Sequence, residues 1–219
     1  MVRTHGLTSY ILSGLLVLFI QAADVGADTP SSPAVKAQKR LVFTMDPDKS
    51  TISFLLKGNV HDTSGSVTKF SQKVFALLDS EGLLIKPEVS LKINAHNLDT
   101  KHTGINKRMK KKFLEVEKYP DIIFSSTGFK PGPEAFQPLR LATRGKPLRF
   151  DLAGDLTIHG TTNSIAVKVT AFQQDNQLVT EGHTTISLKD FGIKNPSLLF
   201  MRVSDQVTID FHIILMLIK

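Results

Sequence analysis

The chain has 219 residues, no cysteine and a formal net charge of +7 at pH 7. This length accommodates one large β-domain or two small ones, and the aliphatic and phenylalanine content is sufficient for a sizeable core. Without cysteine the chain has no disulfide, no thiolate metal ligand, no cysteine nucleophile and no lipid-modified N-terminal cysteine. Glycine and proline are scattered along the sequence, which argues against a fibrous or disordered protein.

Residues 1–27 have the layout of a cleavable secretory signal. Arg3 gives a positive start, residues 10–20 form an apolar run, and small residues follow. The run is shorter than the ~20 residues that cross a bilayer, which favours a signal peptide over an uncleaved anchor. Cleavage after Ala23 or after Ala27 fits the pattern. The segment therefore predicts a periplasmic or secreted protein.

The positive charge remains after removal of the predicted signal. Residues 1–27 contain one basic residue, Arg3, and one acidic residue, Asp24, so the net charge stays at +7. In an exported protein, such an excess favours anionic lipid headgroups or acidic ligands over nucleic acid. The expected partners therefore include an anionic membrane surface and exclude nucleic acid. The sequence gives no indication of the oligomeric state.

From Leu41 onward, apolar residues recur with a period of two, which is typical of half-buried strands. Residues 28–40 show no such period and are expected to form a flexible leader, while residues 41–219 are expected to form one domain. The alternation is clearest in the segments 52–57, 89–96, 148–158, 165–171 and 207–215. Weaker strands are predicted for residues 66–78, 121–127 and 178–189.

Turn residues separate these strands, and one segment is predicted to be helical. Hairpin turns are expected at residues 79–82, 159–163 and 175–176. Residues 103–116 contain few β-branched residues and many helix formers. Thr103 is expected to cap this helix, with Met109 and Phe113 on its inward face.

The combination predicts an all-β fold: an eight-stranded antiparallel barrel with one helix near residues 103–116. The interior of a barrel of ~8 strands either is filled by side chains or holds one small ligand. The alternation of residues leaves both possibilities open.

Several short motifs add a family resemblance. In chain order they are Met45–Phe54, Val60–Gly65, Asn97–Thr100, Phe113–Phe124, Gly154–Thr162, Lys189–Ser197 and Arg202–Asp205. Together and in this order they resemble the YceI-like family of exported, lipocalin-like, polyisoprenoid-binding proteins. The resemblance implies an elongated barrel with a long hydrophobic channel that holds a polyisoprenoid or similar long-chain lipid. It also implies a binding or transport protein rather than an enzyme, without a cofactor.

The sequence departs from this family in the predicted helix. Many members carry an acidic residue and a histidine near its middle, whereas this chain has Asn106-Lys107-Arg108-Met109-Lys110-Lys111-Lys112. The chain also lacks tryptophan, so that aromatic lining must come from phenylalanine. Lys107, Arg108 and Lys110 are candidates for headgroup contacts, and a solvent-exposed helix face is the alternative.

Candidate channel residues lie on the apolar faces of the predicted strands. They are Phe54, Leu56, Leu91, Ile93, Phe150, Leu152, Leu156, Val167, Ile209 and Phe211. Ligand binding by these residues would draw on apolar burial, at ~25 cal/mol per Å².

Two other functions are considered. An enzyme of lipid or isoprenoid-quinone metabolism would use His61 or His159, although no recognisable nucleophile–base set accompanies either residue. For His159, the structural expectation is a turn residue whose ring bonds the local backbone. An interaction protein would instead bind anionic surfaces through Lys110, Lys111 and Lys112.

No metal-binding spacing or nucleotide-binding motif is present. His96 and His102 match no standard ligand spacing. Arg202 lies in an apolar context and is expected to pair with a carboxylate such as Asp190, with the channel as the alternative.

Overall fold

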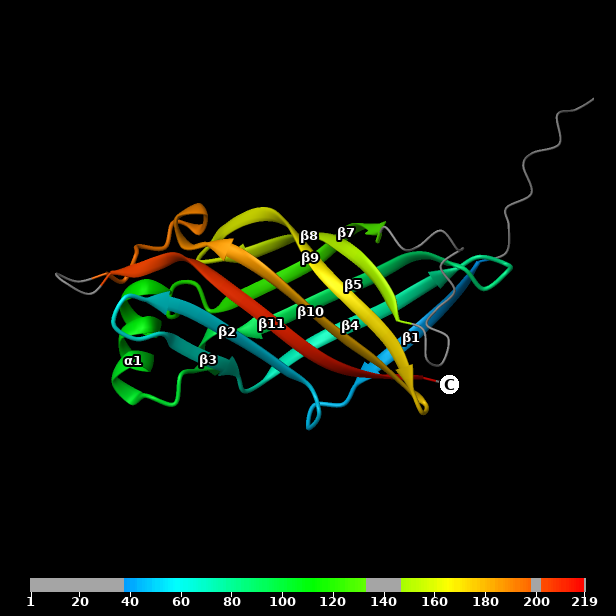
Figure 1. The fold of residues 1–219 in the computed structure, drawn as a ribbon, viewed down its shortest axis with the longest axis horizontal. Coiled ribbons are helices and arrows are strands. Elements are labelled where there is room, and N and C mark those ends of the chain that lie inside the picture. The colour runs from blue at the N-terminus through cyan, green and yellow to red at the C-terminus, as the bar shows by residue number, and fades with distance from the viewer. Residues whose placement is uncertain (1–37, 133–146, 198–201, 219) are drawn as a thin grey trace, which may run out of the picture. The chain divides into compact units, whose positions relative to one another are not determined.

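The computed structural model describes residues 38–132, 147–197 and 202–218, most of which lie in antiparallel strands (Figure 1). The strands are β1 (Lys39–Met45), β2 (Thr51–Gly58), β3 (Thr63–Val67), β4 (Phe70–Leu78), β5 (Leu84–Asn94), β6 (Leu98–Asp99), β7 (Asp121–Pro131), β8 (Leu148–Ile158), β9 (Thr161–Gln174), β10 (Gln177–Ser187) and β11 (Val203–Leu217). The helical segments are η1 (Ala95–Asn97), α1 (Thr103–Arg108), the π-helical turn η2 (Met109–Phe113) and η3 (Leu188–Phe191). The predicted secretory signal lies outside the described residues.

Eight strands close into a ring in the order β1-β4-β5-β7-β8-β9-β10-β11, and β11 pairs back with β1. Strand β11 is long enough to pair with two partners on this side. Its C-terminal end pairs with β1, as in Phe43↔Leu217, and its N-terminal part pairs with β2, as in Phe211↔Ile52. Strands β3 and β6 continue from β2. The predicted eight-stranded antiparallel barrel is therefore confirmed.

The period of two produces the inner and outer surfaces of this wall. Along β8, Phe150, Leu152 and Leu156 are buried, while Asp151 between them is exposed. On the outer face Asp151 stands opposite Lys168 of β9, which is a favourable cross-strand pair of charges. Alternation therefore places apolar side chains inside the barrel and charged side chains in solvent.

Tight turns join the long strands, as predicted. Strands β8 and β9 are connected by His159 and Gly160 alone, with φ angles of 53° and 74°. Two positive φ angles in a two-residue loop define a type I′ turn, which matches the twist of a hairpin. Between β4 and β5, the Asp79 carboxylate accepts hydrogen bonds from the backbone N–H groups of Glu81 and Leu83, both at 2.9 Å.

The predicted helix is confirmed, but it is shorter than expected, because α1 and η2 together end at Phe113. Glu115 has a φ of 43°, and this left-handed conformation stops the helix before Val116. Thr103 was expected to cap the helix, which is wrong. His102 occupies the cap position without a side-chain hydrogen bond. Across the described ranges, no helix is long and apolar enough to cross a membrane.

Strand β1 starts at Lys39, so the last two residues of the segment predicted as a leader belong to the barrel wall. Lys39 and Arg40 pair with Leu78 and Leu77 of β4. The Arg40 guanidinium lies 3.0 Å from the Glu88 carboxylate. Both residues are polar, so the alternation of apolar residues in the sequence could not assign them to a strand.

Candidate functional site

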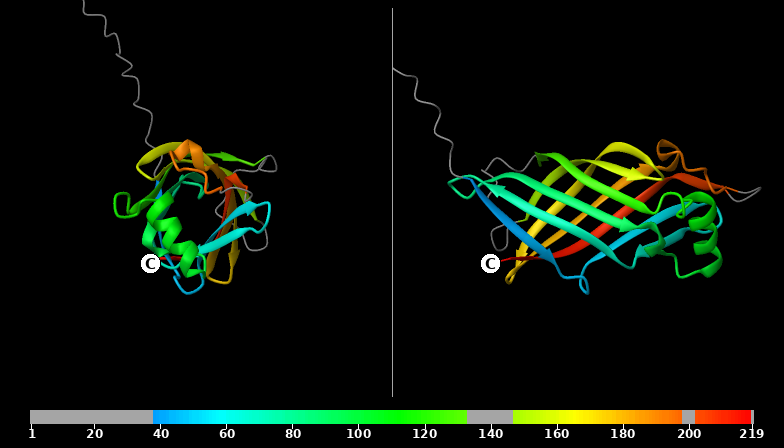
Figure 2. Two further views of the ribbon diagram at one scale, coloured as in Figure 1. Left: turned by 90° about the vertical axis from the view of Figure 1, so that its left-hand side faces the viewer. Right: turned by 180° about the vertical axis from the view of Figure 1, so that it is seen from behind.

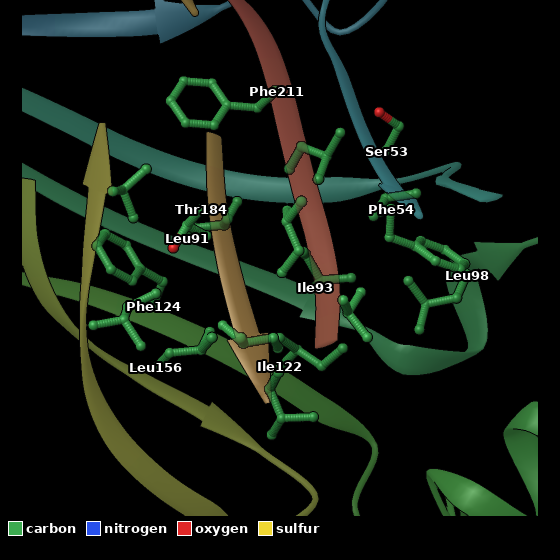
Figure 3. A pocket seen from close by; sticks show the side chains of 18 of the residues that line it. Ser53, Phe54, Leu91, Ile93, Leu98, Ile122, Phe124, Leu156, Thr184 and Phe211 are labelled. Atoms are coloured by element: carbon green, nitrogen blue, oxygen red, sulfur yellow. The ribbon is translucent and has the colours of Figure 1, made fainter. Parts of the chain in front are cut away.

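The barrel is hollow. Its inner face encloses a cavity of about 470 Å³, whose lining is almost entirely apolar and includes residues of every ring strand. Figure 3 shows Phe54, Leu91, Phe124, Leu156 and Phe211 arranged around this space. Drug-sized ligand sites have volumes of about 300–1,000 Å³, so the cavity is large enough for a ligand. The structure therefore decides between a filled and a hollow barrel, which the alternation left open.

All ten predicted channel residues lie on the cavity wall. They are Phe54, Leu56, Leu91, Ile93, Phe150, Leu152, Leu156, Val167, Ile209 and Phe211. They come from β2, β5, β8, β9 and β11, so the closed ring brings together residues far apart in sequence. Their contact with a ligand remains a prediction.

Phenylalanine rings on the wall lie against glycines of neighbouring strands. A Cβ atom built on Gly154 would lie 2.5 Å from Phe124 Cε2, and one on Gly182 would lie 2.6 Å from Phe211 Cζ. Similarly, a Cβ on Gly65 would lie 2.8 Å from Phe54 Cε1. The missing Cβ atoms let these rings pack close to the wall, which leaves more of the interior open.

The helical segment lies across one end of the barrel (Figure 2). Ile105, Met109 and Phe113 line the cavity, which confirms the predicted inward face of Met109 and Phe113. Arg108 also lines it, with its guanidinium carbon 5.6 Å from the centre of the Phe113 ring. This end, where α1 and η2 contribute to the lining, is called the helix end below.

Of the three predicted headgroup residues, only Arg108 is on the cavity wall. Lys107 is exposed to solvent. The Lys110 ammonium group donates a hydrogen bond of 2.8 Å to the carbonyl oxygen of His96, so it holds the helix against the chain before it. The structure therefore separates the basic run into one cavity-lining residue and several outer ones.

Polar contacts fix the start of α1. The Asn106 side-chain oxygen accepts hydrogen bonds from the Thr100 backbone N–H at 2.9 Å and from its hydroxyl at 2.8 Å. The Asn106 amide nitrogen donates to the Asp99 carboxylate at 2.7 Å. This bond, together with the Lys101 backbone N–H, lowers the pKa of Asp99 from 3.8 to about 2. Asn106, read in the sequence only as part of the basic run, therefore positions the helix.

Residues 43–215 match the YceI-like domain, which is most of the chain. The chain belongs to the YceI-like family. A UPF0312 protein of Pseudomonas savastanoi pv. phaseolicola is 35% identical over 122 residues, covering 51% of this chain and 56% of that protein. A UPF0312 protein of Pseudomonas paraeruginosa is 31% identical over 114 residues, covering 49% and 52%. The YceI-like chain thus spans about half the length of the curated relatives that it matches.

Solved structures share the fold. BcnA of Burkholderia cenocepacia has a TM-score of 0.64 at 23% identity, covering 78% of this chain and 99% of that one. A polyisoprenoid binding domain from Saccharophagus degradans has a TM-score of 0.59 at 16% identity, covering 81% and 99%. A YCEI protein of Campylobacter jejuni has a TM-score of 0.52 at 15% identity, covering 74% and 85%. At these identities the likeness concerns the fold alone.

The two histidines considered for catalysis lie in different surroundings. His61 lines the cavity, whereas the His159 ring is 2.8 Å from the Glu115 carboxylate and packs edge-on against Tyr119. The expectation that His159 bonds the local backbone is wrong, because the left-handed end of the helix brings Glu115 to it. In the described part of the chain, no group of three or more histidine or carboxylate side chains is placed to hold a metal ion.

Sequence reasoning missed the polar and loop residues of the cavity wall. Gln72 lies two residues from both Phe70 and Val74 on strand β4, so the alternation of that strand is the signal that places it on the inner face. Arg202 was expected to pair with Asp190, with the channel as the alternative. It lines the cavity, as in the alternative, and the structure shows no ion pair with Asp190. The strand pattern carried no signal for Arg202, because it precedes β11.

Gln72 carries a buried polar group without a partner. Its side-chain nitrogen is the one buried side-chain nitrogen or oxygen atom among the described residues that has no hydrogen bond. Such a group costs about 1–3 kcal/mol of stability. We therefore expect Gln72→Leu to raise the free energy of unfolding of the lipid-free protein by about 1–3 kcal/mol. Urea unfolding followed by circular dichroism measures this change.

The control for this substitution is Gln206→Leu, since Gln206 lies exposed on β11. Water already hydrogen-bonds an exposed amide. We therefore expect the unfolding free energy of Gln206→Leu to differ from that of the wild-type protein by less than about 0.5 kcal/mol. A loss of stability in Gln72→Leu, or equal changes in the two variants, would contradict the assignment of an unsatisfied amide.

Proposed function

We propose that this protein binds one long-chain lipid, a polyisoprenoid or a similar amphiphile, inside the barrel and shields it from water without catalysing a reaction. The observation that carries the proposal is the apolar cavity, which extends from Leu148 and Leu215 to the helix end. Each 100 Å² of apolar ligand surface buried there contributes about 2.5 kcal/mol before the costs of association. The polyisoprenoid binding domain of Saccharophagus degradans, which shares the fold, supports the ligand class.

The chemistry of the wall supports binding without catalysis. His61 is the one imidazole among the described cavity-lining residues, and no aspartate or glutamate lines the cavity with it. The neighbouring Asp62 carboxylate accepts a hydrogen bond of 3.0 Å from the backbone N–H of Gly58, so it stabilises the loop. A general base at this position would therefore lack an orienting carboxylate.

Export and membrane contact are further parts of the proposal. The layout of residues 1–27 supports a periplasmic or secreted protein that meets its lipid outside the cytoplasm. Lys107, Lys111 and Lys112 are exposed on the helical segment, at the helix end of the cavity. Each lysine near an anionic surface contributes about 1 kcal/mol, so this face supports docking on anionic membranes. Unchanged sedimentation with anionic vesicles after all three become Gln would refute this docking.

Lipid binding is tested on the full chain isolated from its own organism without detergent. Native mass spectrometry is expected to show one added hydrophobic compound, which organic extraction removes. The extracted protein is then expected to bind geranylgeraniol in a one-to-one complex, because its cavity holds one chain. A protein that is isolated without ligand, and then takes up neither geranylgeraniol nor a hydrophobic fluorescent probe, would refute the proposal.

A further inference from the structure

Three basic side chains line the mostly apolar cavity: Arg108, Lys194 and Arg202. These three residues are called the mouth cations. Arg108 ends α1, Lys194 follows η3, and Arg202 precedes β11, so separate segments supply them. The views in Figures 1 and 2 agree that the start of β11 and helix α1 lie at the same end of the barrel.

Backbone contacts bring Lys194 and Arg202 to this end together. The Asn195 side chain, next to Lys194, donates a hydrogen bond of 3.0 Å to the carbonyl oxygen of Val203, next to Arg202. The Arg202 backbone exchanges two hydrogen bonds with Asn59 at the end of β2, at 2.8 and 3.0 Å. These contacts fix both positions, and the pairing of Val203 with Gly58 in the β2–β11 ladder adds to them next to Arg202.

Within the described ranges, no carboxylate is paired with a mouth cation. No aspartate or glutamate lies among the described residues that line the cavity, and none of the three mouth cations is in an ion pair there. Elsewhere on the barrel, Arg40 pairs with Glu88 at 3.0 Å and Lys92 with Asp121 at 2.8 Å. Arg108 is partly buried, whereas Lys194 and Arg202 are exposed to solvent. Three like charges at one end of the cavity still raise the positive potential there, most strongly at low salt.

We propose that the cavity selects an amphiphile with an anionic head, a long-chain phosphate or carboxylate, whose head the mouth cations bind while its chain fills the barrel. The inference rests on the proposed lipid binding and adds the charge of the headgroup. A phosphate or carboxylate accepts two parallel hydrogen bonds from an arginine guanidinium, and a lysine adds a point charge. For a neutral alcohol of the same chain length, only the burial of the apolar chain contributes to the binding free energy.

The test compares ligands that differ only in the head. Delipidated full-length protein is titrated with geranylgeranyl phosphate, with geranylgeraniol and with inorganic phosphate, below the critical micelle concentrations. Native mass spectrometry and calorimetry serve as readouts, since the chain has no tryptophan. We expect the phosphate lipid to bind at least about tenfold more tightly than the alcohol at low salt, with the difference shrinking as salt increases.

Two variants that each remove three positive charges distinguish the effect of the mouth cations from the effect of the net charge of the protein. R108Q/K194Q/R202Q removes the mouth cations, and K107Q/K111Q/K112Q removes three exposed charges that do not line the cavity. We expect the first variant to lose the preference for the phosphate lipid and to keep its affinity for geranylgeraniol. The second variant is expected to keep the preference.

Each contrary outcome has its own meaning. Equal affinity of the wild-type protein for both lipids, or equal effects of the two variants, would overturn the anionic head while lipid binding stands. If inorganic phosphate bound as tightly as the phosphate lipid, the ligand of the mouth cations would be free phosphate and not an amphiphile. Failure of both lipids to bind would overturn the proposed function itself.

Discussion

Replacing Phe191 by alanine is expected to lower the free energy of unfolding by about 3–5 kcal/mol. Phe191 is 1% exposed, belongs to a large buried cluster of side chains, and does not line the barrel cavity. It ends η3, and Gly192, with a φ of 67°, turns the chain after it. Truncation removes apolar contacts and leaves a void that the rigid barrel wall cannot fill. Urea unfolding of the lipid-free protein, followed by circular dichroism, measures the loss.

The matched variant is Phe211→Ala, since Phe211 borders the existing cavity and is partly buried. Its removal enlarges a cavity already present, so we expect a smaller loss of about 1–2 kcal/mol. Phe191→Ala is also expected to bind geranylgeraniol with unchanged stoichiometry under conditions where it remains folded. Equal losses of stability in the two variants would mean that Phe211 packs as a filled core residue, in conflict with a hollow barrel.

Gly154→Ala is expected to narrow the cavity. The added Cβ would lie 2.5 Å from Phe124 Cε2 and 2.7 Å from the carbonyl oxygen of Ser125, so the ring and the wall cannot both stay in place. Forced repacking of this kind costs about 1–3 kcal/mol. Because Phe124 lines the cavity, its displaced ring competes with the lipid chain. We expect the affinity for geranylgeraniol to fall at least about tenfold, equivalent to about 1.4 kcal/mol.

Gly128 on the neighbouring strand β7 provides the control. A Cβ atom built there meets nothing within 4 Å, so Gly128→Ala has space for its methyl group. We expect its unfolding free energy to change by less than about 0.5 kcal/mol or to rise slightly, because alanine restricts the unfolded chain. Calorimetric titration compares the two variants. Unchanged affinity in a folded Gly154→Ala would show that the wall accommodates the ring without closing the cavity.

The antiparallel barrel could be predicted because its signal is local. Strand β8 alternates inward apolar and outward polar residues except at Ala153 and Gly154, and the type I′ turn at His159 and Gly160 joins it to β9. Each of these features depends on near neighbours in sequence, so one chain is enough to read them. The end of the helix was harder to predict, since the left-handed conformation of Glu115 departs from the preference of that residue.

The residues of the cavity wall could be predicted only in part. The apolar strand residues were predicted correctly because every second residue of a strand faces inward. Leu152 and Ile209 were predicted to line the cavity for this reason. Gln72 was missed because a polar residue at an inward position looks like a break in the pattern. Lys194 and Arg202 were missed as a pair because neither lies in a strand. One of the contacts that position them also joins Arg202 to Asn59, which is 143 positions away in sequence.

The sequence by itself determined the antiparallel strands, the position of the helix and the apolar character of the inner wall, because hydrophobic periodicity and turn chemistry are local properties. Only the tertiary structure decided that the barrel is hollow and that Arg108, alone among the predicted headgroup residues, reaches the cavity. The first depends on how far side chains extend across a closed ring, and the second on where the folded helix places each charge, as in the bond from Lys110 to His96. Periodicity assigns a residue to a face of the wall, whereas the space between opposite faces depends on the whole barrel.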